Sequence, residues 1–337
     1  MRFLLCILFS AFLFTAVKSL IATNVYNPTT CGLPGPGFKG NKLRAKARRY
    51  VGNDVKRIVK RDIDKDYSVD YNPTAGDETE EDENDPMQTK MMGGQRAAKD
   101  EVPWAAVLLI RKTGVLCGGT LISRRHIITA AHCFMRDLNG TCSVENMLPE
   151  EDLLTGTVVA IGGTCLDRKE EFNCSKEDKP SAFHIKRASY RSFFESGSDY
   201  TRDFAILELT DDVPKHIHHI CLPHMNKNIG IGDSSLRMSS FGWGSDPTKN
   251  LTVVPFLRKV MLVSRCSFGN RVFEKGDSGG GVTAKIGYRT YLVGVLSRGT
   301  PCKDLYSGRQ EPKAQLHTDI TKYTALIDSW LGAKKPK

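Results

Sequence analysis

The stretch Gly276-Asp277-Ser278-Gly279-Gly280 places a serine among three glycines and directly after an aspartate. A serine hydroxyl becomes an effective nucleophile when a base takes its proton and a third group orients that base. Two other stretches offer these roles: Thr129-Ala130-Ala131-His132-Cys133 contains a candidate base, and Arg202-Asp203-Phe204 contains a candidate orienting carboxylate. Because glycine has no Cβ, the backbone N–H of Gly276 can point with that of Ser278 at a developing oxyanion. The sequence therefore predicts an acyl-transfer site with a triad of His132, Asp203 and Ser278 and an oxyanion hole of Gly276 and Ser278.

The chain around these stretches alternates short apolar runs with turn residues, which is typical of an all-β barrel or sandwich. Only the C-terminal end has the apolar spacing of a helix, with one stripe formed by Tyr323, Leu326, Ile327, Trp330 and Leu331. The predicted strands are Ala105–Ile110, Gly119–Ser123, Thr157–Gly162, Phe183–Tyr190, Phe204–Leu209, Phe256–Val263, Gly281–Ile286 and Tyr291–Ser297.

Composition changes sharply near Lys90, which we take as the main domain boundary. The apolar run Phe3–Val17 is followed by small residues that a signal peptidase reads, so residues 1–19 are predicted to be a signal peptide and 91–337 the enzyme domain. Between them, residues 20–90 form a largely disordered propeptide with a basic block, Lys42–Arg61, and then an acidic run, Asp77–Asp85. The formal charge of +10 is concentrated in that basic block, which favours a solvated linker over a nucleic-acid interface.

Secretion predicts an extracellular protein and changes how the ten cysteines are interpreted, because an oxidising compartment favours disulfides. Removal of Cys6 with the signal leaves an odd number of cysteines, so one thiol is free, pairs between chains, or lies in a peptide that is removed. Three Asn-X-Ser/Thr patterns predict glycosylation at Asn139, Asn173 and Asn250. No span of the membrane is expected after the signal is removed.

In the order His, Asp, Ser, and with these flanking residues, the chain resembles the chymotrypsin/trypsin-like serine peptidase family from about Met91 to Leu331. The resemblance implies two antiparallel six-stranded β-barrels with a C-terminal helix, and neither a metal nor an organic cofactor. Further matching landmarks are Met91–Gly94 followed by Pro103-Trp104, Cys117–Ile122, Gly242-Trp243-Gly244, and Leu296–Gly299.

The resemblance also implies roles for individual residues. Ser297 supports the triad carboxylate, Gly299 lies on the strand that pairs with substrate backbone, and Cys117 pairs with Cys133. Cleavage after Lys90 would free the Met91 amine, which would insert and pair with Asp277 to shape the oxyanion site. Cys31 and Cys221 resemble the pair by which some relatives keep the propeptide attached after activation.

Several positions depart from the family pattern around the expected specificity pocket. Val272 stands where trypsin-like members place an aspartate, followed by Phe273, and Arg298 replaces a tryptophan. Because a valine offers no charge to a cationic side chain, we expect cleavage after apolar or small residues rather than after Arg or Lys. Glu274 stands in place of the cysteine that normally pairs with Cys302, and Cys266 could be a substitute partner. The partners of Cys142, Cys165, Cys174, Cys266 and Cys302 stay open, although Cys165 and Cys174 could close a loop together.

The main hypothesis is a secreted serine endopeptidase made as a zymogen. The resemblance implies protein or peptide substrates, an activating protease and protease inhibitors as its partners. One alternative is a peptidase-like binding or regulatory protein with a blocked cleft, which the residues at 272, 273, 274 and 298 motivate. Another is that the basic propeptide binds a polyanion in its own right.

Overall fold

The computed structural model describes residues 26–39, 94–137, 144–166, 172–190, 202–225, 237–244, 255–262, 278–298 and 316–332. Apart from Lys39, these residues belong to one compact unit of the chain. The predicted signal peptide 1–19 and most of the predicted propeptide 20–90, including its basic and acidic runs, lie outside the described residues.

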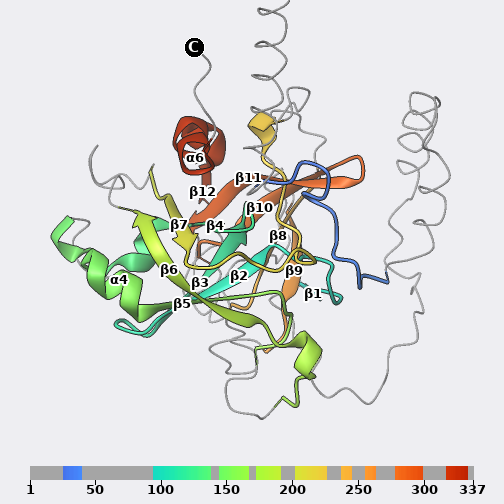
Figure 1. Ribbon diagram of the computed structural model, residues 1–337, viewed down its shortest axis with the longest axis horizontal. Coiled ribbons are helices and arrows are strands. Elements are labelled where there is room, and N and C mark those ends of the chain that lie inside the picture. Colours follow the sequence, from blue (N-terminus) through green and yellow to red (C-terminus); the bar gives the residue numbers. More distant parts are fainter. Residues whose placement is uncertain are drawn as a thin grey trace, which may run out of the picture. The chain divides into compact units, whose positions relative to one another are not determined.

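The first sheet is an antiparallel barrel that closes on itself in the order β2-β3-β4-β7-β6-β5 (Figure 1). β5 completes the circle by pairing with β2, with Ala106 opposite Ile161. The buried side chains of the barrel strands are mostly apolar and many are β-branched, which suits a pleated surface buried on one side. The strands are β2 (Ala105–Ile110), β3 (Val115–Leu121), β4 (His126–Thr129), β5 (Thr157–Ile161), β6 (Ser181–Ser189) and β7 (Ala205–Leu209).

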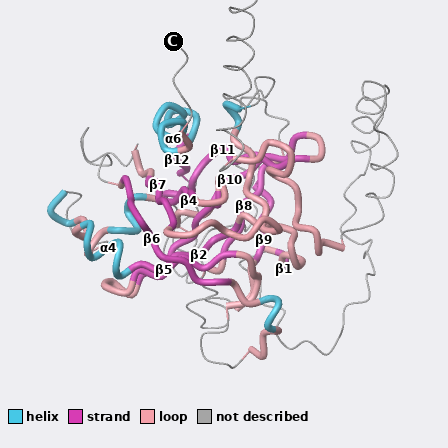
Figure 2. The backbone as a smooth tube through the Cα atoms, in the orientation of Figure 1, coloured by secondary structure: helices cyan, strands magenta, loops and turns pink. Residues whose placement is uncertain are grey.

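The second sheet has six antiparallel strands in the order β1-β9-β8-β10-β11-β12, and Figure 2 shows its strands in magenta beside those of the barrel. Among the described residues, strand pairing closes the first sheet into a barrel but does not close the second. The all-β prediction is confirmed, with two six-stranded sheets and a helix at the C-terminal end. The strands are β1 (Gln95–Arg96), β8 (Met238–Gly242), β9 (Arg258–Leu262), β10 (Gly281–Ile286), β11 (Arg289–Arg298) and β12 (Leu316–Asp319).

β11 contains a bulge at Ser297. Leu296 pairs with His317 and Arg298 pairs with Leu316, so Ser297 is an extra residue in β11 that has no counterpart in β12. A bulge of this kind bends the strand and changes the direction of a side chain.

All eight predicted strands are present, with ends shifted by a few residues. Four further strands were not predicted: β1, β4, β8 and β12. β1 has two residues, and β8 and β12 are rich in Ser, His, Thr and Asp, so no alternating apolar pattern marks them. Pairing with neighbouring strands, rather than the strands' own composition, accounts for β1, β8 and β12.

The predicted C-terminal helix is present as the 3₁₀ helix η7 (Ile320–Tyr323) followed by α6 (Thr324–Trp330). Ile327 and Leu331 are buried on its inner face. A second helix, α4 (Glu150–Gly156), was not predicted, because its only apolar side chains are the adjacent Leu153 and Leu154, which show no helical period. None of the helices in the described ranges is long and apolar enough to cross a bilayer.

One large apolar cluster joins the barrel, β11 of the second sheet and the C-terminal helix. Trp243, Phe134 and Phe204 are among its largest fully buried side chains. The indole Nε1–H of Trp243 donates to the carbonyl of Thr164 at 3.1 Å, so this buried polar group is satisfied. The cluster also includes Tyr26 and Cys31, which come from the N-terminal part of the chain.

We call residues 26–38 the N-terminal strap. The strap lies within the predicted propeptide, yet it has defined structure and belongs to the same unit as residues 90–337. Cys31 is bonded to Cys221, with 4.8 Å between their Cα atoms. The strap is therefore fixed covalently to the body that carries the candidate site.

Candidate active site

The pairing of β4 with β7 brings the candidate base and carboxylate together. Thr129 pairs with Ala205, so the 3₁₀ helix η1 (Ala131–Phe134) after β4 and Asp203 before β7 lie at the same end of the two strands. The Nδ1 of His132 lies 2.6 Å from Oδ2 of Asp203, and the backbone N–H of His132 donates to Oδ1 at 2.9 Å. Both carboxylate oxygens of Asp203 are therefore hydrogen-bonded to His132.

The second sheet supplies a further bond to the same carboxylate. Ser297, the bulged residue of β11, donates its hydroxyl to Oδ2 of Asp203 at 2.6 Å. Asp203 is 0% exposed, and a buried charge is tolerated only when it is hydrogen-bonded or paired. With His132 donating through its backbone and ring and Ser297 through its hydroxyl, the carboxylate meets that requirement.

Ser278 lies at a turn that is anchored to both sheets. Its carbonyl accepts the N–H of Gly118 in β3 at 2.7 Å, while Gly279 N–H donates to Leu296 of β11 at 2.8 Å. Gly279 has φ +83°, and a Cβ there would lie 2.2 Å from Oγ1 of Thr129. Only glycine fits this close approach, so the serine turn is packed directly against the strand that leads to His132.

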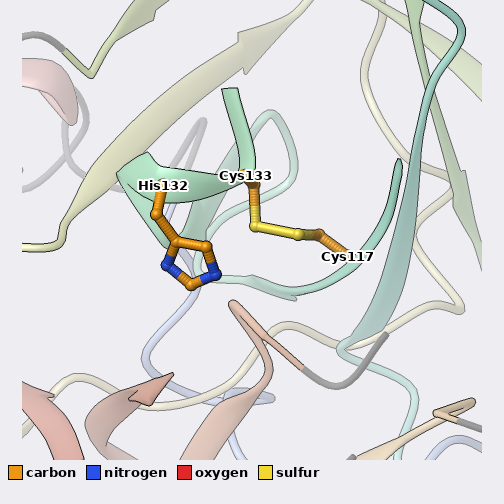
Figure 3. A group of neighbouring side chains, drawn as sticks. All are labelled: Cys117, His132 and Cys133. Carbon is orange, nitrogen blue, oxygen red and sulfur yellow. A yellow bond between two sulfur atoms is a disulfide. The ribbon is translucent and has the colours of Figure 1, made fainter. Parts of the chain in front are cut away.

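A disulfide between Cys117 and Cys133 braces the histidine. Figure 3 shows the sulfur–sulfur bond beside the imidazole of His132. The ligand atoms of these three residues lie within 4.8 Å of one another, a spacing at which a metal could be held. The two sulfurs form a disulfide, and Nδ1 of His132 is hydrogen-bonded to Asp203. These ligand atoms are therefore already used in structural contacts rather than free to bind a metal.

Cys165 and Cys174 form a third disulfide. This pairing, which the sequence left undecided, closes a loop shortly after the end of β5. Asn173, one of the three expected glycosylation sites, is exposed next to this bond, with φ 44°. Asn139 and Asn250 lie outside the described residues, as do Cys142, Cys266 and Cys302.

The structure brings together His132, Asp203 and Ser297, and places Ser278 at a turn bonded to Gly118 beside Cys117. Other expected site residues lie outside the described residues. These are Gly276 of the oxyanion hole, Lys90, Met91 and Asp277 of the activation switch, and Val272, Phe273 and Gly299 of the substrate cleft. For Arg298 only the backbone, as the last residue of β11, is described.

Two contacts to the aspartate segment were not anticipated from the sequence. Thr318 of β12 donates its hydroxyl to the backbone carbonyl of Asp203 at 2.8 Å, and the ring of Tyr323 stacks on Phe204 with centroids 4.1 Å apart. Burial raises the pKa of Tyr323 to about 12, so its hydroxyl is protonated at neutral pH. Tyr323 was part of the predicted helical stripe, but nothing in the sequence marked the weakly apolar β12 as an element near the triad.

Comparison with known proteins agrees with this geometry. The trypsin family model matches residues 91–161 and 163–309, which is more than half of the chain. The chain belongs to the trypsin family of serine peptidases.

The individual relatives share little more than a quarter of their aligned residues with this chain. The trypsin-like protease try-5 of Caenorhabditis elegans is 28% identical over 290 residues, covering 73% of this chain and 88% of that protein. The proclotting enzyme of Tachypleus tridentatus is 27% identical, over 64% of this chain and 60% of its own length. Kallikrein 1-related peptidase b3 of Mus musculus is 28% identical, over 74% of this chain and 93% of its own.

Proposed function

We propose that the chain is the zymogen of a secreted serine endopeptidase that hydrolyses peptide bonds through an acyl-enzyme. The observation that carries this proposal is the buried Asp203 carboxylate, which binds His132 through two atoms and Ser297 through a third bond. A family member without catalytic work would have no physical need to keep a charge in this position.

In the proposed reaction each residue has one role. The Asp203 carboxylate accepts the Nδ1–H of His132, which leaves Nε2 as the base that takes the hydroxyl proton of Ser278. The serine oxygen attacks the peptide carbonyl, and the N–H groups of Gly276 and Ser278 stabilise the oxyanion. His132 returns the proton to the leaving amine, and a water molecule then releases the acyl group by the same route.

For activation, we propose cleavage after Lys90, followed by pairing of the new Met91 amine with Asp277. We also propose that the strap stays attached after this cleavage. The Cys31–Cys221 disulfide supports this, because a chain cut after Lys90 would still hold the residues near Cys31. A Lys90→Gln variant should accumulate as a stable, inactive precursor. Full activity of that variant would refute the activation step.

For specificity, we propose that residues before the scissile bond are apolar or small, with Val272 and Phe273 at the pocket and Arg298 and Gly299 along the cleft. The support is the absence of a carboxylate at position 272. Activated protein digested with an unbiased peptide library should cut after such residues. A strong preference for Arg or Lys would overturn this assignment.

For the cell biology, we propose that residues 1–19 direct secretion and that Asn139, Asn173 and Asn250 carry glycans. The exposed position of Asn173 supports modification there. Protease inhibitors and an activating protease are the expected partners. Polyanion contact through the basic block is a separate property that salt-sensitive heparin binding by residues 20–90 would test.

The decisive experiment is covalent labelling of Ser278 with a fluorophosphonate after cleavage at Lys90. Rapid labelling that is lost in Ser278→Ala supports the endopeptidase. A correctly cleaved, folded protein that stays unlabelled favours the second candidate, a peptidase-like binding protein, which the departures at Val272, Phe273, Glu274 and Arg298 motivate.

A further inference from the structure

The backbone of Asp203 is held by a residue from the far edge of the second sheet. Thr318 is 4% exposed, and its hydroxyl donates to the carbonyl oxygen of Asp203 at 2.8 Å. The two residues are 115 positions apart in the sequence. Together with Ser297, Thr318 is one of two hydroxyl donors to Asp203 that the second sheet supplies among the described residues.

We propose that Thr318 is a positioning residue for the proton transfer at His132. It fixes the peptide unit that follows the Asp203 Cα, so that the carboxylate keeps its two contacts with His132. The inference rests on the proposed endopeptidase function and assigns to that site a residue outside the expected triad and its Ser297 support.

The need for such an anchor follows from the local backbone. Asp203 precedes β7, which begins at Ala205, so it is not held by a strand ladder of the barrel. Instead, Phe204 N–H donates to the carbonyl of Arg202 at 2.7 Å, and Asp203 is the central residue of this three-residue turn. A turn this short leaves the direction of the Asp203 side chain dependent on contacts from outside it.

Thr318 and Ser297 approach Asp203 from neighbouring strands. Val295 of β11 pairs with Thr318 of β12, and Ser297 lies two residues beyond Val295. Ser297 binds the carboxylate and Thr318 binds the backbone carbonyl, so the second sheet fixes the residue at both ends. The pairing of β11 with β12 thereby sets the orientation of a side chain that belongs to the barrel.

The next residue is held from the same segment. The ring of Phe204 stacks on that of Tyr323, with centroids 4.1 Å apart and an interplanar angle of 10°. Tyr323 ends η7, which directly follows β12. Contacts on two successive residues resist rotation of the turn more effectively than either contact alone.

The test compares Thr318→Val with Thr283→Val. Valine matches the shape of threonine but cannot donate a hydrogen bond. Thr283 is the matched control, because it is 2% exposed in the same sheet and donates to the carbonyl of Ser239 at 2.9 Å, away from the triad. Both variants remove a threonine–carbonyl bond, and Thr283→Val also removes a 3.0 Å contact with the Ser239 hydroxyl, so the control should lose at least as much thermal stability as Thr318→Val.

Only Thr318→Val should slow the chemistry. Because small displacements of catalytic groups are costly, we expect kcat to fall about tenfold while KM stays within about twofold, and fluorophosphonate labelling to slow in proportion. Thr318→Ser retains the donor and should recover most of kcat. Labelling rates are expressed per folded molecule, and Thr318→Ala serves as a second deletion of the hydroxyl if valine prevents folding.

The outcomes separate the two levels of inference. If wild type is labelled and Thr318→Val or Thr318→Ala reacts at the wild-type rate, Thr318 has no positioning role and the inference is overturned. If Thr283→Val loses as much kcat as Thr318→Val, the effect is one of general stability and the inference is equally overturned. If activated wild type is not labelled at all, the proposed function fails, and the role of Thr318 in that reaction fails with it.

Discussion

The two ends of the described chain are attached to the same body by different physical means. The N-terminal strap (residues 26–38) is held by a disulfide and by polar bonds to backbone atoms. The C-terminal segment (residues 316–332) is held by a strand pairing and by buried apolar and aromatic side chains. The disulfide holds the strap covalently even after a cut in the chain, whereas noncovalent packing and strand pairing hold the C-terminal segment. Both reach the main core, the strap through Tyr26 and Cys31 only.

Backbone atoms dominate the contacts of the strap. Gly32 N–H donates to the carbonyl of His219 at 2.8 Å, and its carbonyl accepts from Thr290 at 3.0 Å. Gly32 has φ +65°, and a Cβ there would lie 2.3 Å from the Thr290 carbonyl oxygen, so this close approach requires glycine. The guanidinium of Arg289 adds bonds to the carbonyls of Cys31 at 2.8 Å and Thr29 at 2.9 Å.

Side chains dominate the contacts of the C-terminal segment. Ile327 is 0% exposed within the main core. The ring of Trp330 has the guanidinium of Arg187 on one face, 4.0 Å from its centroid, and the edge of His126 nearby. Arg187 also pairs with Glu208, whose pKa is raised by burial but lowered overall by its bonds to Arg187 and Lys186.

The largest stability loss is expected from the apolar attachment. Ile327→Ala should lower the free energy of unfolding by about 4 kcal/mol, because it removes buried methyl groups and leaves a cavity. Leu316→Ala in the same segment is the control, since Leu316 is 55% exposed and its truncation should change stability by less than about 0.5 kcal/mol. Equal effects in thermal or denaturant unfolding would contradict this account of the C-terminal segment.

The covalent attachment should have a somewhat smaller effect on stability and a specific effect on retention. Replacing Cys31 and Cys221 together by Ser should cost about 3 kcal/mol, the middle of the typical range measured for a disulfide. After cleavage at Lys90, the strap should leave this variant on a gel-filtration column under native conditions and stay with wild type. The matched pair Cys165→Ser and Cys174→Ser should keep the strap, and a strap that stays bound without Cys31 would show that its polar contacts suffice.

Acid should weaken both attachments, because each attached segment packs against a buried neutral histidine of the body. Burial lowers the pKa of His126, next to Trp330, from 6.5 to about 4, and burial lowers that of His219, under Tyr26 and Asn27, to the same value. The unfolded chain binds these protons at a higher pH than the folded chain does. The contribution of these two histidines to the free energy of unfolding is therefore complete above pH 6.5 and is lost as the pH falls towards 4.

Each histidine should contribute roughly 3 kcal/mol to this loss, from the size of its pKa shift. His126→Asn keeps an acceptor for the Ser123 hydroxyl, which lies 2.8 Å from Nδ1, and cannot titrate. Its stability should change less with pH between 6.5 and 4 than that of wild type. The exposed His216 gives the control, His216→Asn, and a wild-type slope in His126→Asn would refute the assignment.

The smallest effect is expected at Arg289. Arg289→Met should cost about 1 to 2 kcal/mol, because two carbonyls of the strap lose a charged donor while the aliphatic stem is kept. Hydrogen exchange of the Gly32 amide reports the strap directly and should become faster. Lys285→Met, an exposed change on the preceding strand of the same hairpin, should leave that exchange unchanged.

The sequence predicted the all-β fold class and the contacts of His132 and Ser297 with Asp203, whereas several strands and other contacts of the site have no recognisable sequence pattern. His132, Asp203 and Ser278 stand in short stretches whose flanks are distinctive, and Ser297 was expected at the carboxylate, where the structure places it. Thr318 could not be found in this way, because its partner is a backbone carbonyl, and any residue type supplies one. The same limit applies to β12 and to the polar contacts of the strap, which are largely with backbone atoms, whereas the Cys31–Cys221 pair of the strap was expected from the sequence.

The bulge at Ser297 makes the length of β11 as important as its composition. Ser297 is the one residue of this stretch without a partner in β12, and a bulge of this kind bends the strand and redirects the side chain that it carries. Deleting Ser297 would therefore do more than remove a hydroxyl, because Leu296 and Arg298 would become consecutive opposite His317 and Leu316 and β11 would lose its bend. The hairpin turn at Gly287 and Tyr288, where Tyr288 is 71% exposed, has no such constraint. Insertions and deletions should accordingly be accepted at that turn and rejected nine residues later.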